Sequence, residues 1–403
     1  MGIFKSSSSS ANHTCPMPRP LTEDPTDPVV GGLSFYHLNM IVSGACVAFS
    51  CLVIFALMIR HATHFSNPNQ QLKIMRICVI IPIYAIFSFI SIVVPAAYAY
   101  LEPWIDLFQA IALGDFFLLM SEFVTPTDRH RDLFFSALEI PQKKRGQSTL
   151  DGLAWYRKKW TAIFQYVVVS LAIAILTDIF EAANKYCLES SKPYFAHLWL
   201  EIIHNVSLVI AVMAVLNFYT MLKTELADHK PLAKLLAFKL LVGLNFLLKI
   251  IYWILGDISP SPLNPSSTMN YADLKIGLPL MITCIEMVPF SVFFHYAYSA
   301  TPFLIPSSDP ESVEPMAGGV RPHYQGGPLG VSAWLAFLNP SEIIQAVIFA
   351  FRMPSRARER SGDVIEGAVP MEARMGGLDG YGRNKNARYP ETVTYPRYGY
   401  DGY

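Results

Sequence analysis

Charged and amide side chains lie inside long apolar stretches of this sequence. Side chains in such positions can bind a proton or a solute that crosses a membrane. Asp115 and Glu122 stand seven residues apart, which places both on one face of a helix. Seven further positions share this setting: Gln165, Asn205, Asn217, Lys239, Lys249, Glu286 and His295. An ionisable side chain near the bilayer centre costs at least about 2.5 kcal/mol. We therefore expect these side chains to face the interior of a helix bundle or water.

The expected depth of each residue divides this set into two layers. Asp115, Asn205, Lys249 and Glu286 fall at middle or outer levels, whereas Glu122, Gln165, Asn217, Lys239 and His295 fall closer to the cytosol. Either layer could be part of a pathway in which carboxylates and lysines exchange partners as a solute passes. A set of buried pairs that fixes helix packing would have the same composition. The sequence leaves both interpretations open.

The elements that position these residues are predicted to be membrane-spanning helices. The chain of 403 residues is 52% hydrophobic and only 15% charged, which is more apolar material than a soluble core uses. A span needs about 20 apolar residues. Seven stretches qualify: 38–59, 77–97, 104–124, 161–181, 197–219, 236–255 and 277–298. The sequence thus predicts an all-α membrane protein with a bundle of seven transmembrane helices.

The distribution of basic residues predicts how the bundle lies in the membrane. Cytoplasmic loops retain the excess of Lys and Arg, and the third loop is strongly basic, with Lys143, Lys144 and Arg145 among eight such residues. The N-terminus is then outside and the C-terminus cytosolic. The expected divisions are an exterior tail (1–37), the helix bundle (38–300), a flexible linker (301–330), a cytosolic amphipathic helix region (331–355) and a disordered tail (356–403).

Motifs before the first span bear on the same orientation. Asn12 begins an N-glycosylation sequon, which requires an exterior tail, whereas Met1-Gly2 with Ser6 fits a loose myristoylation pattern, which requires a cytosolic one. The loop charges favour the glycosylated alternative. Cys15 and Cys187 are the two cysteines on the exterior side, and they either form a disulfide or stay as free thiols.

The segment after the linker has the pattern of an amphipathic helix. Asn339, Pro340 and Glu342 are typical of a helix start, with Asn as the cap and Glu reaching back to it. Apolar residues then recur at helical spacing up to Phe351, and a basic cluster begins at Arg352. Such a helix could lie on the cytosolic membrane surface, bind a cytosolic partner or pack against the bundle. All three alternatives stay open.

Several short motifs resemble those of a known family, that of the organic solute transporter alpha subunit, which includes the transmembrane protein 184 group. The strongest is the stretch 67–71 followed by Ile74-Met75-Arg76-Ile77 and by Ile81-Pro82-Ile83-Tyr84. The other matching positions are Pro231, Lys234, Phe238 and Lys239; Cys284-Ile285-Glu286-Met287 with His295 and Tyr298; and Gln165-Tyr166-Val167. The resemblance covers about residues 38–300 in the same order.

The resemblance implies a seven-helix carrier related to those of bile-acid-like and steroid-conjugate anions. Many fungal and plant members of the family lie on the vacuolar membrane, so this membrane is favoured over the plasma membrane or another endomembrane. Some members are linked to vacuole integrity and autophagy, which suggests a scaffold or regulator acting through its cytosolic tail as the alternative. The stretch 104–110 lacks the Tyr-Glu-Ala pattern of the family, and the third loop lacks the cysteine cluster of transporter-type members. Both departures separate this chain from those members.

Other functional classes fit less well. Asp128-Arg129-His130 resembles a receptor motif but follows Thr125-Pro126, outside the third span, and the last span lacks Asn-Pro-x-x-Tyr. No nucleophile motif, phosphate loop or zinc-binding cluster is present, so we expect neither an enzyme nor a cofactor. The balance of 31 basic and 31 acidic residues gives no indication of a nucleic-acid partner. Expected partners are the bilayer, a cytosolic protein for the helix starting at Asn339, and a second copy or an accessory subunit.

Overall fold

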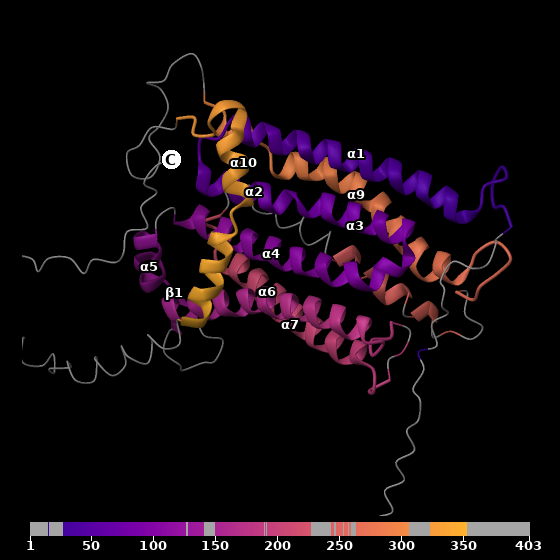
Figure 1. The fold of residues 1–403 in the computed structure, drawn as a ribbon. Helices are drawn as coiled ribbons and strands as arrows, with labels where there is room; N and C mark the ends of the chain where they lie inside the picture. The colour runs from indigo at the N-terminus through magenta and orange to yellow at the C-terminus, as the bar shows by residue number, and fades with distance from the viewer. Residues whose placement is uncertain are drawn as a thin grey trace, which may run out of the picture. The chain divides into compact units, whose positions relative to one another are not determined.

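A computed structural model of the chain consists of long helices that lie side by side, with one segment running across them (Figure 1). The structure describes residues 15, 27–125, 128–140, 150–188, 190, 192–226, 243–245, 247–252, 254–256, 258, 263–305 and 323–352. The long helices are α1 (Phe35–Thr63), α2 (Pro68–Cys78), α3 (Ile80–Val93), α4 (Tyr98–Val124), α6 (Gly152–Ala182), α7 (Ala196–Met221) and α9 (Leu278–Ala297). The shorter elements are η1 (Pro95–Ala97), α5 (Asp128–Ala137), β1 (Glu139–Ile140), β2 (Leu150–Asp151), the π-helical turn η3 (Asp273–Gly277), η4 (Thr301–Phe303), η5 (Pro328–Gly330) and α10 (Val331–Leu338).

The prediction of an all-helical protein with seven helices of spanning length is confirmed. Six of the seven helical segments that are long and apolar enough to cross a membrane coincide with predicted spans. The seventh is 328–352, which the sequence predicted as an amphipathic helix. Residues 236–242, 246 and 253 of the predicted span 236–255 lie outside the described residues, and its described residues, from 243 onward, are helical.

The helix starts and stops follow from local chemistry. Ser34 caps α1 by accepting a hydrogen bond from the backbone N–H of His37, and Asn67 caps α2 ahead of Pro68, which suits the first helical position. A proline lacks the N–H that would bond to the carbonyl four residues earlier. Pro82 therefore cannot bond to Cys78, and the helix is interrupted at Val79, between α2 and α3.

The bundle is organised as two groups of helices joined at α4. In the first group α1 packs against α3 and α9; in the second α6 packs against α4 and α7. Helices α2 and α3 both contact α4 and so connect the groups. In the second group, the centroids of the Phe117 and Phe218 rings lie 4.9 Å apart, and Phe135 stacks on Tyr156 at 4.0 Å. Offset aromatic contacts of this kind fix the spacing of α4, α5, α6 and α7.

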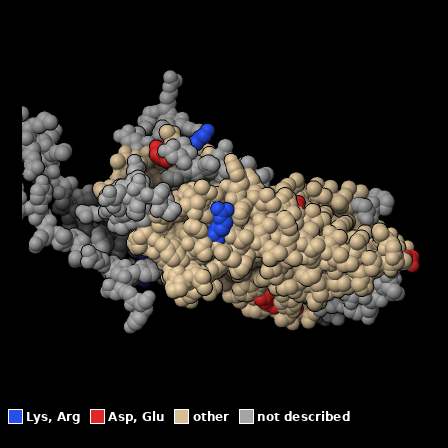
Figure 2. All heavy atoms as spheres, turned by 90° about the horizontal axis from the view of Figure 1, so that it is seen from above, with Lys and Arg blue, Asp and Glu red and all other residues tan. Residues whose placement is uncertain are grey.

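The outer surface of the bundle is apolar, as a lipid environment requires. Large apolar side chains point outward along α1 and α7, among them Leu52, which is 70% exposed, and Met213. Figure 2 shows a face of the bundle on which few Lys, Arg, Asp and Glu side chains appear. A soluble protein seldom leaves so large a continuous apolar surface in water. Burying it in hydrocarbon is the arrangement that its composition favours.

The two ends of the bundle differ in their chemistry. At one end α1 and α4 finish and α2 and α6 begin, and the basic third loop of the sequence connects there. We call this the basic end. At the opposite end the structure joins Cys15 and Cys187 in a disulfide, with their Cα atoms 5.7 Å apart. The bridge attaches the chain before α1 to the connection between α6 and α7.

The segment 323–352 crosses the basic end of the bundle (Figure 1). We call it the transverse segment; it contains η5, α10 and helical residues 341–352. Gln325 donates a backbone hydrogen bond to the Phe65 carbonyl at 2.8 Å, and Trp160 donates through Nε1 to the Ala346 carbonyl at 2.9 Å. Among the three predicted placements, the structure shows the helix packed against the bundle.

Gly330 lets the transverse segment approach α1 closely. Its φ of +80° lies in the left-handed region that favours glycine. A Cβ atom at this position would lie 2.9 Å from both the Cβ and the carbonyl oxygen of Ala62. Glycine is therefore needed here both for the turn and for the contact.

A first prediction concerns the disulfide. A protease site inserted into the third loop allows the chain to be cut between Cys15 and Cys187. The two fragments should migrate together on a non-reducing gel and separate when reductant is added, because the bridge is the covalent link between them. Cys187→Ser, as the control, should separate in both lanes. Separation of the wild-type fragments without reductant would contradict the pairing.

Candidate functional site

Helix α2 carries two cations into the bundle near its basic end. Lys73 and Arg76 are three residues apart, so they lie on one face of α2. Both side chains are buried, with exposed fractions of 6% for Lys73 and 8% for Arg76. Buried cations need carboxylates or carbonyl oxygens as partners, since the bundle interior cannot solvate them as water does.

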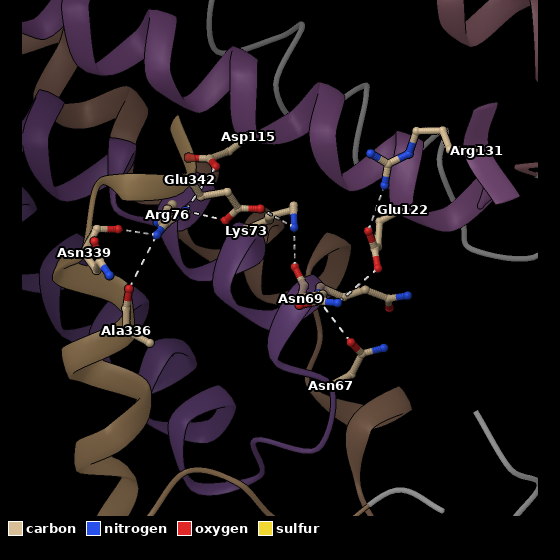
Figure 3. Close-up of polar contacts among 11 residues, drawn as sticks. Asn67, Asn69, Lys73, Arg76, Asp115, Glu122, Arg131, Ala336, Asn339 and Glu342 are labelled. Atoms are coloured by element: carbon tan, nitrogen blue, oxygen red, sulfur yellow. Dashed lines mark hydrogen bonds and ion pairs between the residues drawn. The ribbon is translucent and has the colours of Figure 1, made fainter. Parts of the chain in front are cut away.

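Arg76 holds α2 and the transverse segment together (Figure 3). Its Nη1 lies 2.8 Å from Oε2 of Glu342, and its Nη2 donates to the backbone carbonyls of Asn339, at 2.6 Å, and Ala336, at 3.4 Å. Lys73 contacts the other oxygen of the same carboxylate, with Nζ 2.6 Å from Oε1. Each oxygen of Glu342 thus contacts one cation.

Asp115 brings a second carboxylate to these cations from α4. Its side chain is fully buried, and Oδ1 lies 3.7 Å from Nη1 of Arg76. Among the described residues, neither carboxylate oxygen has a hydrogen-bond partner. Lys73, Arg76, Asp115 and Glu342, which we call the Arg76 cluster, therefore contain two cations and two carboxylates, and one carboxylate has spare acceptor capacity.

Glu122 lies about two helical turns beyond Asp115 and extends the polar contacts toward the basic end. Its Oε1 accepts from Nδ2 of Asn69 at 3.5 Å, and Oε2 lies 3.4 Å from Nη2 of Arg131 in α5. Asn69 in turn accepts a hydrogen bond through its backbone carbonyl from Lys73, at 2.8 Å. The pair Asp115 and Glu122 therefore lies on the face of α4 that meets α2, as the seven-residue spacing predicted.

A second set of polar contacts crosses the bundle through Gln109 of α4. The Tyr84 hydroxyl of α3 donates to Oε1 of Gln109, and Nε2 of Gln109 donates to the Tyr166 hydroxyl of α6 at 3.3 Å. We call these three residues the Gln109 chain. Nearer the disulfide end, Lys249 pairs with Glu102 at 2.8 Å. The His204 ring, which contacts Tyr166, lies 3.5 Å from Asp106.

The predicted layers are only partly reproduced by these contacts. Asp115 was predicted at the level of Lys249 but joins the Arg76 cluster instead, because Arg76 of α2 reaches it from the basic end. Gln165 exchanges hydrogen bonds with Ser207 between α6 and α7, which is a packing contact. Within the described residues the structure does not bring the remaining candidates into the Arg76 cluster: Asn205, Asn217, Glu286 and His295. Lys239 and Asn12 lie outside the described residues.

The motif residues take several different places. Arg76 and Tyr84 belong to the two polar sets above, and Pro82 separates α2 from α3. Met287 is buried in the core, and the Tyr298 carbonyl contacts Nε2 of His61 at 2.8 Å. Pro231 and Lys234 lie outside the described residues. The first and strongest motif therefore supplies Arg76 of the cluster and one end of the Gln109 chain.

Sequence reasoning missed the role of Glu342. The predicted cap is present in part, because the Asn339 side chain accepts a hydrogen bond from the Ser341 N–H at 3.0 Å. Glu342, however, points to Lys73 and Arg76 rather than back to the cap. Lys73 and Gln109 were missed as well. The three-residue spacing of Lys73 and Arg76 was the available signal for a cationic face on α2.

The described residues contain no group of three or more His, Cys, Asp and Glu side chains that could hold a metal ion. The chemistry available at the Arg76 cluster is ion pairing and hydrogen bonding. A guanidinium and an ammonium that converge on one carboxylate form a site for an anionic group.

The sequence was compared with protein families, with curated proteins and with solved structures. The sequence profile of the family described as organic solute transporter Ostalpha matches residues 39–303. A transmembrane protein 184 homologue of Dictyostelium discoideum is 25% identical over 306 residues, which cover 72% of this chain and 58% of that protein. The chain thus spans less than two thirds of the length of this curated relative. No solved structure matches the chain.

A second prediction concerns the stabilising role of Arg76. Arg76→Ala removes the guanidinium from the fully buried Asp115 and from the partly exposed Glu342, which should cost about 3 to 5 kcal/mol of folding free energy. Thermal unfolding in detergent, followed by size-exclusion chromatography, measures the loss. The matched control is Arg60→Ala, an exposed arginine in the last turn of α1, which should change stability by less than about 0.5 kcal/mol. Equal shifts for the two variants would contradict a central role for Arg76.

Proposed function

Because this chain belongs to the organic solute transporter Ostalpha family, we propose that it is a membrane carrier and not an enzyme, moving amphipathic organic anions or sterol derivatives. The curated relative is named only as a transmembrane protein 184 homologue, so its name assigns no solute. The solute class rests on the family description and on the chemistry of the Arg76 cluster.

The observation that carries the proposal is the unsatisfied Asp115 carboxylate beside Arg76. Buried ion pairs that serve packing alone are stabilising only when hydrogen bonds satisfy their remaining polar atoms. Asp115 is fully buried, and neither of its oxygens has a hydrogen-bond partner in the described part of the chain. Arg76 is therefore shared between Asp115 and Glu342 at 3.7 and 2.8 Å. A cation with two competing carboxylates can exchange one of them for a solute group.

We further propose that the basic end faces the cytosol and that the N-terminus is exterior, in the vacuolar membrane. The basic residues of the third loop support this orientation. The disulfide between Cys15 and Cys187 also supports it, because disulfides persist in oxidising compartments and this one lies at the opposite end. Fluorescent tagging, together with glycosidase treatment of Asn12→Gln and wild type, tests location and orientation.

A third prediction tests transport directly. Purified full-length protein in liposomes should accelerate the uptake of labelled estrone sulfate over protein-free liposomes. Asp115→Asn keeps the shape of the side chain but removes its charge, so Arg76 loses one of its two exchangeable partners. Uptake should then fall about tenfold or more.

The matched control is Glu201→Gln in α7, a carboxylate that is 52% exposed and lies outside the Arg76 cluster. It should transport like wild type. Absence of uptake and efflux by the wild-type protein, for estrone sulfate and for other organic anions, would count against the carrier function.

A second candidate function is a membrane scaffold whose transverse segment recruits a cytosolic partner. The observation that favours it is the outward apolar face of α10, where Leu338 is 72% exposed and Leu335 is similarly placed. Apolar patches of this kind often mark protein or membrane contacts.

A fourth prediction separates the two functions. The double substitution Leu335→Asp and Leu338→Asp changes the outward face without touching the Arg76 cluster. If the protein is a scaffold, the double variant should lose its partners in affinity purification and should not rescue the vacuolar phenotype of cells that lack the protein. Its transport activity in liposomes should be retained. Full rescue of the phenotype by the double variant, with unchanged partners, would contradict the scaffold function.

A further inference from the structure

Glu342 differs from the rest of the Arg76 cluster in where it comes from. Lys73, Arg76 and Asp115 belong to helices of the bundle, whereas Glu342 lies on the transverse segment. Its two oxygens contact Lys73 at 2.6 Å and Arg76 at 2.8 Å, which is the arrangement that a free carboxylate, sulfate or phosphate would adopt between the two cations (Figure 3).

The charges of the cluster show what Glu342 contributes. With Glu342 in place, two cations face two carboxylates and the formal charge is zero. If the transverse segment moves away, the bundle keeps two buried cations and one carboxylate. Arg76 then also loses the carbonyl oxygens of Ala336 and Asn339 as acceptors. An uncompensated buried cation is strongly unfavourable, so this state calls for another anion.

Exposure indicates the direction from which an anion can arrive. The side chain of Glu342 is 33% exposed, whereas Lys73 and Arg76 are nearly closed off from solvent. The open side of the cluster is therefore the side that Glu342 covers. An anion reaching the cations from the basic end has to take the place of this carboxylate.

We propose that Lys73 and Arg76 form an anion-binding site and that Glu342 occupies it as a tethered substitute, so that the transverse segment is an autoinhibitory latch. An anionic group, carboxylate, sulfate or phosphate, displaces Glu342 when it binds. The inference deepens the proposed carrier function by locating the anionic end of the solute, but binding at the site requires no transport. The group can come from an organic solute or from the headgroup of an acidic lipid.

The latch is attached to the bundle at several points along its length, one of which is the backbone hydrogen bond from Gln325 to Phe65. Besides Glu342 and the carbonyls bound by Arg76, the attachments include the bonds of Trp160 to Ala346 and of Thr161 to Ala350, at 2.9 and 3.4 Å. The close approach of Gly330 to Ala62 fixes the other end. The latch can thus be weakened in two independent ways, by neutralising Glu342 or by adding a methyl group at Gly330.

The experiment measures equilibrium binding of tritiated estrone sulfate to the full-length protein in phosphatidylcholine nanodiscs. Glu342→Gln should bind about tenfold more tightly than wild type, or about 1.4 kcal/mol, because the competing charge is gone. Gly330→Ala should also tighten binding, although it leaves every charge in place, because the added Cβ and the left-handed φ oppose docking. Glu201→Gln should bind like wild type.

Adding Arg76→Gln to Glu342→Gln should abolish the gain, which separates an anion site from a general loosening of the bundle. Unchanged or weaker binding by both Glu342→Gln and Gly330→Ala would overturn the proposal and leave Glu342 as a packing residue. Tighter binding without flux in liposomes would support the site and refute the carrier function. Flux in liposomes without an effect of either substitution on binding would support the carrier function and refute the anion site.

A further arm distinguishes the two sources of the anion. The binding of Glu342→Gln is repeated in nanodiscs that contain phosphatidylserine. Loss of the gain there, but not with added inorganic phosphate, would identify acidic lipid headgroups as occupants of the same site. An unchanged gain would identify the solute. Both outcomes support the anion site and assign its ligand.

Discussion

The structure depends on the neutralisation of Arg76 inside an apolar bundle. A guanidinium stays charged at every physiological pH, so burial cannot be relieved by losing a proton. The chain has to supply anions, and it does so from two directions, with Asp115 from α4 and Glu342 from the transverse segment. This requirement connects α2 to α4 and also determines where the segment after the bundle comes to rest.

Much of the fold could be predicted because a helix that crosses a membrane must consist mainly of apolar residues. Long apolar runs located six of the spanning helices, and the apolar outer surface of α1 and α7 follows from the same requirement. The break at Val79 was not predicted, because the hydropathy of this stretch does not depend on the backbone N–H that Pro82 lacks. The transverse segment was predicted as an amphipathic helix from its cap and its basic end, although length and composition alone do not distinguish it from a span. Its length and hydropathy suit both, and its contacts with Phe65 and Trp160 determine its direction.

The candidate site was predicted in part for a related reason. Intramembrane charge drew attention to Asp115 and Glu122, and the seven-residue spacing placed them correctly on one face of α4. Their partners could not be derived, because Glu342 is 266 residues from Arg76 along the chain and the pattern around it had a sufficient local explanation as a helix start. A local pattern can explain a residue completely and still miss its long-range contact. The cations themselves were visible in sequence as the spacing of Lys73 and Arg76.

The two polar sets share one feature of placement, which relates the fold to the movement of a carrier. Both cross the contacts of α4 with its neighbours: Arg76 and Asp115 between α2 and α4, and the Gln109 chain from α3 through α4 to α6. Helices α2 and α3 are also what joins the two groups of the bundle. Any displacement of one group against the other must therefore break or exchange these contacts first. Apolar packing elsewhere can slide at small cost, but buried polar contacts have discrete partners. The alternatives available to Arg76 thus limit which rearrangements of the bundle are accessible.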